Sequence, residues 1–161
     1  MREWLVGGAV IEGPEGVLLV RNRRRNGSHD WSTPGGVIDP GETLLEGLTR
    51  EVAEETGLVV TGWEGPIYAI SAEAPDLGWR LRVEVHRATG YEGYLVVDDP
   101  DGIVVEARFV SPDACVTHLD ACQQWVREPL SEWIADRFTE RRDYGYRVLG
   151  ADVATLAVHR T

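Results

Sequence analysis

Alternating apolar and polar positions predict several β-strands along this chain. The clearest run spans Trp79 to Ala88, where Leu81, Val83 and Val85 alternate with charged residues and His86. One face of this strand should therefore be buried and the other exposed to solvent. The remaining expected strands are Trp4 to Ile11, Val17 to Arg21, Pro66 to Ser71, Tyr94 to Val97, Ile103 to Val110 and an edge strand from Val153 to Val158.

A helical period is clearest between Thr43 and Thr56. Leu44, Leu48 and Val52 recur every four residues and fall on one stripe, which predicts a helix with one buried side. Gly57 follows directly, and glycine suits the left-handed conformation that often ends a helix. The acidic residues of this segment fall outside the apolar stripe.

Two further helices are predicted near the end of the chain. They span Asp113 to Val126 and Pro129 to Phe138, with Pro129 expected in the first turn of the second. We find no internal repeat and no linker, so one domain is expected over residues 1–161, with its last helices within 113–138.

Composition narrows the range of partners. A hydrophobic content of 43% in 161 residues is enough for one core. The 27 acidic and 16 basic residues give a net charge of −11, which disfavours binding to a nucleic acid polymer or an anionic membrane. Cys115 and Cys122 are expected as reduced thiols in a cytoplasmic protein. A small anionic substrate fits this charge only if cations offset it locally.

Three glutamates in the first helix point to such a cation site. At 100° per residue, Glu51, Glu54 and Glu55 lie within a sector of roughly 100° on the helix surface. Carboxylates that crowd together repel one another unless a cation neutralises them. Oxygen donors are the ligands that Mg²⁺, Mn²⁺ and Ca²⁺ prefer, so the pattern predicts a site for a hard divalent cation, with Mg²⁺ or Mn²⁺ as the expected cofactor.

Residues before and within the helix complete this pattern. Glu42 precedes the helix and Arg50 lies two turns into it, so the guanidinium can clamp the carboxylate in one orientation. Gly35 and Gly36 allow a sharp loop whose backbone can approach the ion, because no Cβ stands in the way.

Together these residues resemble the signature of the Nudix hydrolases. The match runs from Gly36 through Glu42, Arg50 and Glu51 to Leu58, including Glu54, Glu55 and Gly57, and shows no departure. The likeness extends over roughly Trp4 to Pro112, with flanking segments Gly8 to Val10, Val17 to Arg21, Trp31, Pro34 to Gly36 and Glu106 to Val110. It implies an α+β fold, an α/β/α sandwich with a curved mixed sheet.

The resemblance also implies roles for the residues of the signature, the box at 36–58. Glu51 and Glu55 correspond to the principal metal ligands, and Glu54 to a further ligand or to the group that takes a proton from the attacking water. Arg50 and Glu42 correspond to the orienting pair.

Two further expected roles fall on residues outside the helix. The Gly35 carbonyl is a further expected metal ligand. In some members of the family the proton acceptor lies outside the box in a later loop, and the sequence leaves four candidates open: Asp98, Asp99, Asp101 and Glu106.

Substrate contacts are expected from cations and aromatic rings outside the box. A basic stretch offsets the acidic surface around a phosphate chain and contains Arg21, Arg23, Arg24 and Arg25, of which Arg21 and Arg23 are the expected substrate contacts. Trp31 and Trp79 are candidates for stacking on a base. Asp101 and Glu106 complete the expected substrate contacts. Solvated arginines and core tryptophans are the alternative interpretation of these residues.

The leading functional hypothesis is a MutT-like nucleoside triphosphate pyrophosphohydrolase that removes damaged nucleotides. A pyrophosphatase for ADP-ribose or another nucleoside diphosphate sugar is the alternative, since Pro75 lies one residue beyond the position of a proline typical of such enzymes. Asp76 stands near the position where dinucleoside polyphosphate enzymes tend to have tyrosine. A non-catalytic nucleotide-binding regulator with the same fold is a third hypothesis, and a homodimer is compatible with each.

Overall fold

Ten strands form two sheets in the computed structural model, which describes residues 1–161. The large sheet is mixed, because β7 is parallel to β1 and antiparallel to β6. Its order is β10 (Ala157–Arg160), β9 (Arg142–Leu149), β6 (Val59–Ala74), β7 (Trp79–Glu92), β1 (Arg2–Val10) and β5 (Gly35–Val37). The small sheet contains β2 (Glu12–Gly13), β3 (Gly16–Arg23) and β4 (His29–Ser32), and β8 (Val104–Val110) pairs with β3.

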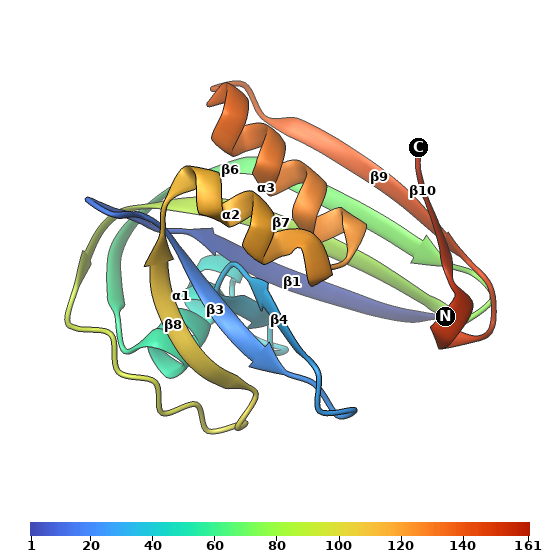
Figure 1. Cartoon of the computed structure of the whole chain (residues 1–161), viewed down its shortest axis with the longest axis horizontal. Helices are drawn as coiled ribbons and strands as arrows, with labels where there is room; N and C mark the ends of the chain where they lie inside the picture. The colour runs from blue at the N-terminus through green and yellow to red at the C-terminus, as the bar shows by residue number, and fades with distance from the viewer.

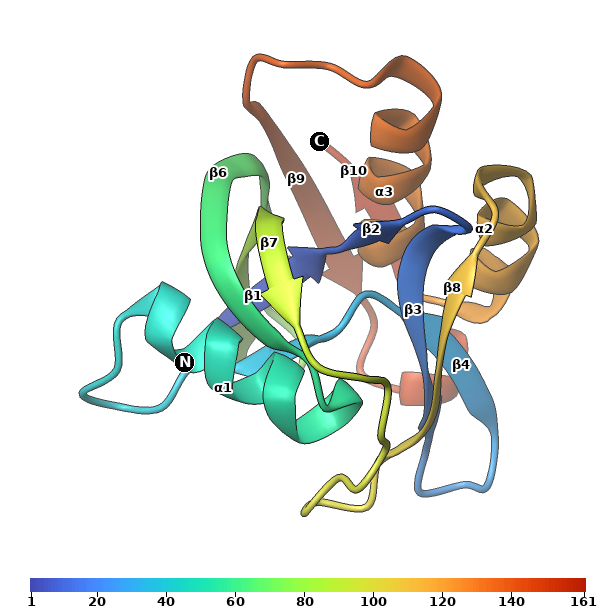
Figure 2. The same ribbon diagram turned by 90° about the vertical axis from the view of Figure 1, so that its left-hand side faces the viewer.

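Helices cover the strands from both sides. Figure 1 shows α2 (Pro112–His118) and α3 (Gln124–Asp136) over one side, and Figure 2 shows α1 (Leu44–Thr56) on the other. The expected α+β fold with helices around a mixed sheet is therefore confirmed. The strands divide between two sheets, because β4 and β8 pair with β3 and not with the large sheet.

Each side of the strands has its own hydrophobic core. The larger core includes Val10 and Leu19 and lies against α2 and α3, whereas the smaller one includes Ala9 and Leu18 and lies against α1. Neighbouring residues of β1 and β3 thus point into different cores. This burial on both faces explains why the two strands are almost continuous apolar runs in the sequence.

The predicted first helix is confirmed with its two ends. The Thr43 hydroxyl accepts a hydrogen bond from the backbone N–H of Glu46, and the Glu46 carboxylate accepts one from Thr43, which forms a capping box. Gly57 ends the helix at φ 82°. Leu48 and Val52 are fully buried in the smaller core.

The later helices differ from the prediction. α2 ends at His118, a 3-10 turn η1 (Leu119–Ala121) follows, and α3 begins at Gln124. The prediction of a single helix from Asp113 to Val126 was therefore wrong. The break lets Leu119 become fully buried. Pro129 lies inside α3 and not in its first turn. The burial of Leu130 and Trp133, which follow it, offsets the loss of the backbone hydrogen bond that proline cannot donate.

Two strand predictions need correction. Tyr94 to Val97 forms no strand, because the Val96 N–H donates to the Thr56 carbonyl at the end of α1 at 2.8 Å instead of to a neighbouring strand. The expected strand from Val153 to Val158 starts as a 3-10 turn, η2 (Val153–Thr155), and only β10 pairs with β9.

Other segments extend the predicted pattern. β6 begins at Val59, well before the expected Pro66, and β9 was not predicted at all. His86, expected on the exposed face of β7, is buried at 6% exposure because β6 lies against it, so that a Cβ on Gly65 would be 3.2 Å from Nδ1. No helix has the length and apolar character needed to cross a membrane.

Candidate functional site

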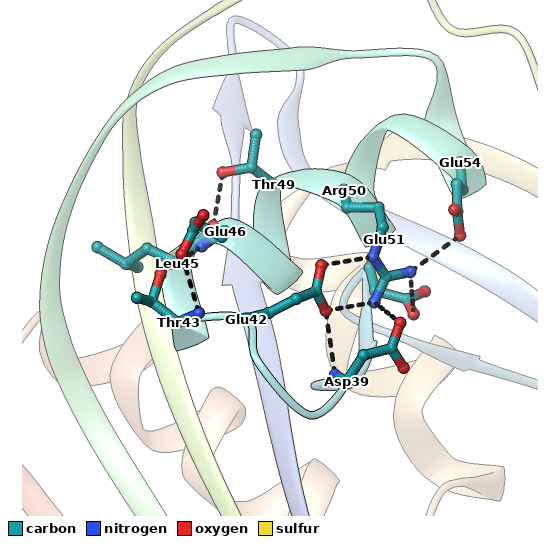
Figure 3. Close-up of polar contacts among 9 residues, drawn as sticks. All are labelled: Asp39, Glu42, Thr43, Leu45, Glu46, Thr49, Arg50, Glu51 and Glu54. Carbon is teal, nitrogen blue, oxygen red and sulfur yellow. Dashed lines mark hydrogen bonds and ion pairs between the residues drawn. The ribbon is translucent and has the colours of Figure 1, made fainter.

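Arg50 lies at the centre of the acidic face of α1 (Figure 3). Its guanidinium donates two hydrogen bonds to Glu42, from Nε at 2.8 Å and from Nη2 at 2.9 Å. Nη1 donates to Glu51 at 3.0 Å and to Glu54 at 3.3 Å. Asp39 lies 3.3 Å from Nη2. The expected clamp between Arg50 and Glu42 is present, and it reaches three further carboxylates.

The clamp holds Glu42 in one orientation. Its hydrogen bonds with Arg50 lower the pKa of Glu42 to about 2 and raise the pKa of the guanidinium. The backbone N–H of Asp39 donates to the same carboxylate at 3.0 Å. Gly47 leaves the necessary space, since a Cβ there would lie 3.0 Å from Glu42 Oε1.

Glu51 and Glu55 both reach the glycines of β5. Glu55 is 8% exposed and accepts a hydrogen bond from the Gly35 N–H at 3.3 Å. Glu51 lies so close to Gly36 that a Cβ on this glycine would be 2.8 Å from Oε2. Burial raises the pKa of Glu55 to about 8 and also raises the pKa of Glu51. Burial makes the ionised form of both carboxylates unfavourable, and a cation between them would stabilise that form.

The carboxylate oxygens of Glu51 and Glu55 at the two glycines are ligands that a hard divalent cation prefers. No three acidic, His or Cys side chains gather closely enough to form a complete cage by themselves. Arg50 contributes to this arrangement, because its Nη1 bonds both Glu51 and Glu54. Glu51 and Glu55 are the side chains that could hold an ion at the glycines, with Glu54 beside them. The role of the Gly35 carbonyl stays a prediction.

Gly36→Ala is expected to weaken the site without unfolding the chain. The new Cβ would lie 2.7 Å from Glu51 Cδ, so this carboxyl group would have to move. If Glu51 holds a metal ion as expected, a displacement of this size lowers activity roughly tenfold to a hundredfold. Manganese affinity by calorimetry and the melting temperature separate the two effects. Gly90→Ala is the control, because its backbone has no positive φ and its Cβ would meet only the hydroxyl of the exposed Thr61, at 2.8 Å. Equal losses in both variants would contradict the prediction.

An acidic loop between β7 and β8 is attached to the end of α1. The hydrogen bond from Val96 to Thr56 ties it there. Gly57 provides the space, since a Cβ at this residue would lie 2.8 Å from the Tyr94 carbonyl oxygen. The loop therefore brings its acids toward Glu51 and Glu55 although it is distant in sequence.

The loop acids differ in their availability. The Asp99 carboxylate accepts hydrogen bonds from the backbone N–H groups of Asp101, Ile103 and Val104 at 3.1, 3.0 and 2.9 Å. It closes the turn of its own loop. Glu106 is paired with Arg21 and Arg108. Of the four candidates outside the box, Asp98 and Asp101 are exposed and have no such partners.

A cavity of about 180 Å³ adjoins Gly35 on the large sheet. Its polar lining comes from Arg24, Ser32 and Thr33, and its apolar lining from the large sheet and α3: Val6, Tyr68, Ile70, Leu81, Val83, Val85, Trp125 and Val126. Because the Gly35 N–H bonds Glu55, the cavity and the carboxylates share one glycine. We call this space the inner cavity.

Arg24 lines the inner cavity, whereas the predicted Arg21 and Arg23 do not. Arg21 lies 3.5 Å from Glu106, and Arg23 is exposed and makes no ion pair. Arg24 donates to Asp30 from Nε at 2.7 Å and from Nη2 at 2.8 Å. An acid six residues away was the available signal, since such a pair can form across a hairpin.

The other predicted substrate residues lie apart from the inner cavity. Trp31 packs against His118 with ring centroids 5.0 Å apart, and the Arg108 guanidinium lies 5.4 Å from its centroid. Trp79 packs edge to face on Trp125 at 6.1 Å. Neither tryptophan lines the inner cavity, nor do Asp101 and Glu106. Pro75, in the turn after β6, is also outside its lining.

Comparison with known proteins places these features in a family. The family model of the NUDIX domain matches residues 2–134. Over 74 residues the chain is 35% identical to mouse 8-oxo-dGDP phosphatase NUDT18, covering 46% of this chain and 22% of that protein. An RNA pyrophosphohydrolase of Caulobacter vibrioides is 30% identical over 114 residues, covering 62% of this chain and 66% of the other.

Solved structures agree with this match at the level of the fold. The MutT protein of Bacillus halodurans superposes with a TM-score of 0.68 at 20% identity, covering 98% of this chain and 97% of that one. The ORF135 protein of E. coli gives 0.70 at 20% identity, covering 87% and 96%. The domain match across most of the sequence, together with the clamp and the carboxylates of α1, shows that this chain belongs to the Nudix hydrolase family.

Proposed function

We propose that this chain is a divalent-metal-dependent hydrolase that cleaves a diphosphate linkage, with nucleoside triphosphates as MutT-like substrates. The observation that carries the proposal is the position of Glu51 and Glu55 at the two glycines, one of which also lines a cavity. This arrangement supports phosphates at the glycines and a nucleoside in the inner cavity. The match to 8-oxo-dGDP phosphatase supports a nucleotide as the substrate.

The side chains divide the chemistry among them. Glu51 and Glu55 would hold Mg²⁺ or Mn²⁺, which would neutralise the charge that develops on the phosphate oxygens. Glu54 takes the proton from the attacking water, and its contact with Arg50 fixes its direction. Arg50 and Glu42 act as positioning residues, because Arg50 holds Glu51 and Glu54 and Glu42 holds Arg50. Asp101 is the alternative proton acceptor.

Substrate selection is proposed to lie at the inner cavity. Arg24 has two of its nitrogens bound to Asp30, which leaves Nη1 to donate to an oxygen or ring nitrogen of a base. The apolar lining from the large sheet suits the faces of a ring. The free thiols Cys115 and Cys122 are consistent with the proposed cytoplasmic location.

Product release from a panel of nucleotides tests the proposal. The panel contains the common nucleoside triphosphates, their 8-oxo forms, a nucleoside diphosphate and ADP-ribose, each with Mg²⁺, with Mn²⁺ and with EDTA. We expect metal-dependent release of phosphate or diphosphate from at least one triphosphate. Hydrolysis of ADP-ribose alone would select the sugar nucleotide hypothesis. Tight binding of a nucleotide without any release would select the regulator.

A further inference from the structure

A second cavity continues the inner one along the large sheet. It measures about 250 Å³ and is lined by four residues: Trp4, Trp79, Leu81 and Trp125. Two of them, Leu81 and Trp125, also line the inner cavity. We call this second space the outer cavity. The two cavities are therefore neighbours that share Leu81 and Trp125, and we call the pair the groove.

Strand register places the two cavities one after the other along β1 and β7. Gly8 pairs with Val85, Val6 with Val83 and Trp4 with Leu81, and all of these residues line one or both cavities. Alternate residues of a strand share one face, so the groove follows β1 and β7 from Gly8 to Trp4, about 13 Å. Gly35 pairs with Gly8, which places the carboxylates at one end and the tryptophans at the other.

The chemistry of the lining changes along the groove. Polar side chains occur beside Gly35, whereas all four residues of the outer cavity are hydrophobic. A polar group placed there would lose hydrogen bonds to water without replacement. An aromatic ring would instead gain contact with indole rings, and Trp4 is 38% exposed without such a ligand.

We propose that the outer cavity binds an apolar aromatic substituent carried by the base of a nucleotide substrate. The proposal rests on the proposed function, since it takes phosphates at the carboxylates and the base in the inner cavity. Phosphate, sugar, base and substituent then follow one another in the same order as the parts of the groove. The substrate class is a nucleotide with a bulky aryl adduct on its base, beyond the compact oxidised bases.

A pair of nucleotides that differ in one group tests the proposal. ATP and ATP with a benzyl group on the exocyclic amine are compared in kcat/KM with Mn²⁺, and in Kd by calorimetry with Ca²⁺ in place of Mn²⁺. We expect the benzyl compound to be favoured by roughly tenfold, the size of one aromatic stacking contact. In Trp4→Ala this ratio should fall to about one. Trp79→Phe, which keeps an aromatic ring on the core, should give an intermediate ratio.

Controls separate this proposal from its rivals. Tyr94→Ala removes an aromatic residue that is 85% exposed and lies outside the groove, and it should leave the ratio unchanged. A ratio near one in the wild type, or one that Trp4→Ala does not alter, would overturn the proposal. So would a change from dimer to monomer in Trp4→Ala with an unaltered ratio, because the tryptophans would then bind a second copy.

The two proposals fail in different ways. Absence of hydrolysis of both compounds, combined with tighter binding of the benzyl compound, would reject the proposed function and retain the outer cavity as a ring-binding site. Hydrolysis of both at equal rates with equal Kd would retain the function and reject the outer cavity.

Discussion

Glu54→Gln is expected to lower kcat by at least roughly a hundredfold while the protein stays folded. The amide has the size of the carboxylate, and its oxygen can still accept the hydrogen bond that Arg50 Nη1 donates to Glu54 at 3.3 Å. It has no basic oxygen to take a proton from water. Steady-state kinetics on the best nucleotide of the panel, with the melting temperature, measures both consequences.

Glu46→Gln is the matched control for this result. Glu46 is in the same helix, but its carboxylate closes the capping box at Thr43, a role that glutamine also fills. We expect kcat within a factor of about two of the wild type. If Glu54→Gln kept comparable activity, the proton acceptor would lie elsewhere, and Asp101→Asn would be the next variant to measure.

Glu55→Gln is expected to make the metal-free protein more stable at pH 8 while it weakens metal binding. Burial raises the pKa of the Glu55 carboxyl to about 8 from its ordinary 4.5. Between these values the unfolded chain loses this proton and the folded chain keeps it, so the stability of the metal-free wild type falls as pH rises. Glutamine carries no charge and removes this dependence.

The size of the effect follows from the pKa difference. Between the two pKa values, each pH unit changes the free energy of unfolding of the wild type by roughly 1.4 kcal/mol. The difference in unfolding free energy between Glu55→Gln and the wild type should therefore widen steadily from pH 5 to pH 8 in EDTA. Urea unfolding at several pH values measures it. Adding Mn²⁺ should stabilise the wild type far more than the variant. A lower stability of Glu55→Gln at pH 8 in EDTA would show that Glu55 stabilises the fold by itself.

The chemical core of the site was predictable from sequence because it is local. The helical period of α1 alone determines that Glu51, Glu54 and Glu55 share one side, and Thr43 and Gly57 define its ends. A turn of chain between Glu42 and Arg50 is short enough for the pair to meet. These contacts depend on residues within one helix and the loop before it.

The groove was not predictable, because it depends on contacts between distant segments. The register of β1 with β7 and the packing of α3 bring Val6, Val83 and Trp125 around one space. The same applies to the basic hairpin, where the sequence favoured Arg21 and Arg23. Pairing of β3 with β8 directs Arg21 to Glu106 and leaves Arg24 at the cavity.

The sequence by itself determined the family, the acid-bearing helix and the alternation of the central strands, because each is a pattern over neighbouring residues. Only the tertiary structure decided which cations and tryptophans line the groove, how the acidic loop reaches α1, and that β9 joins the large sheet. Those features arise from strand pairing and helix packing between segments far apart in the chain, and periodicity carries no information about which segments become neighbours.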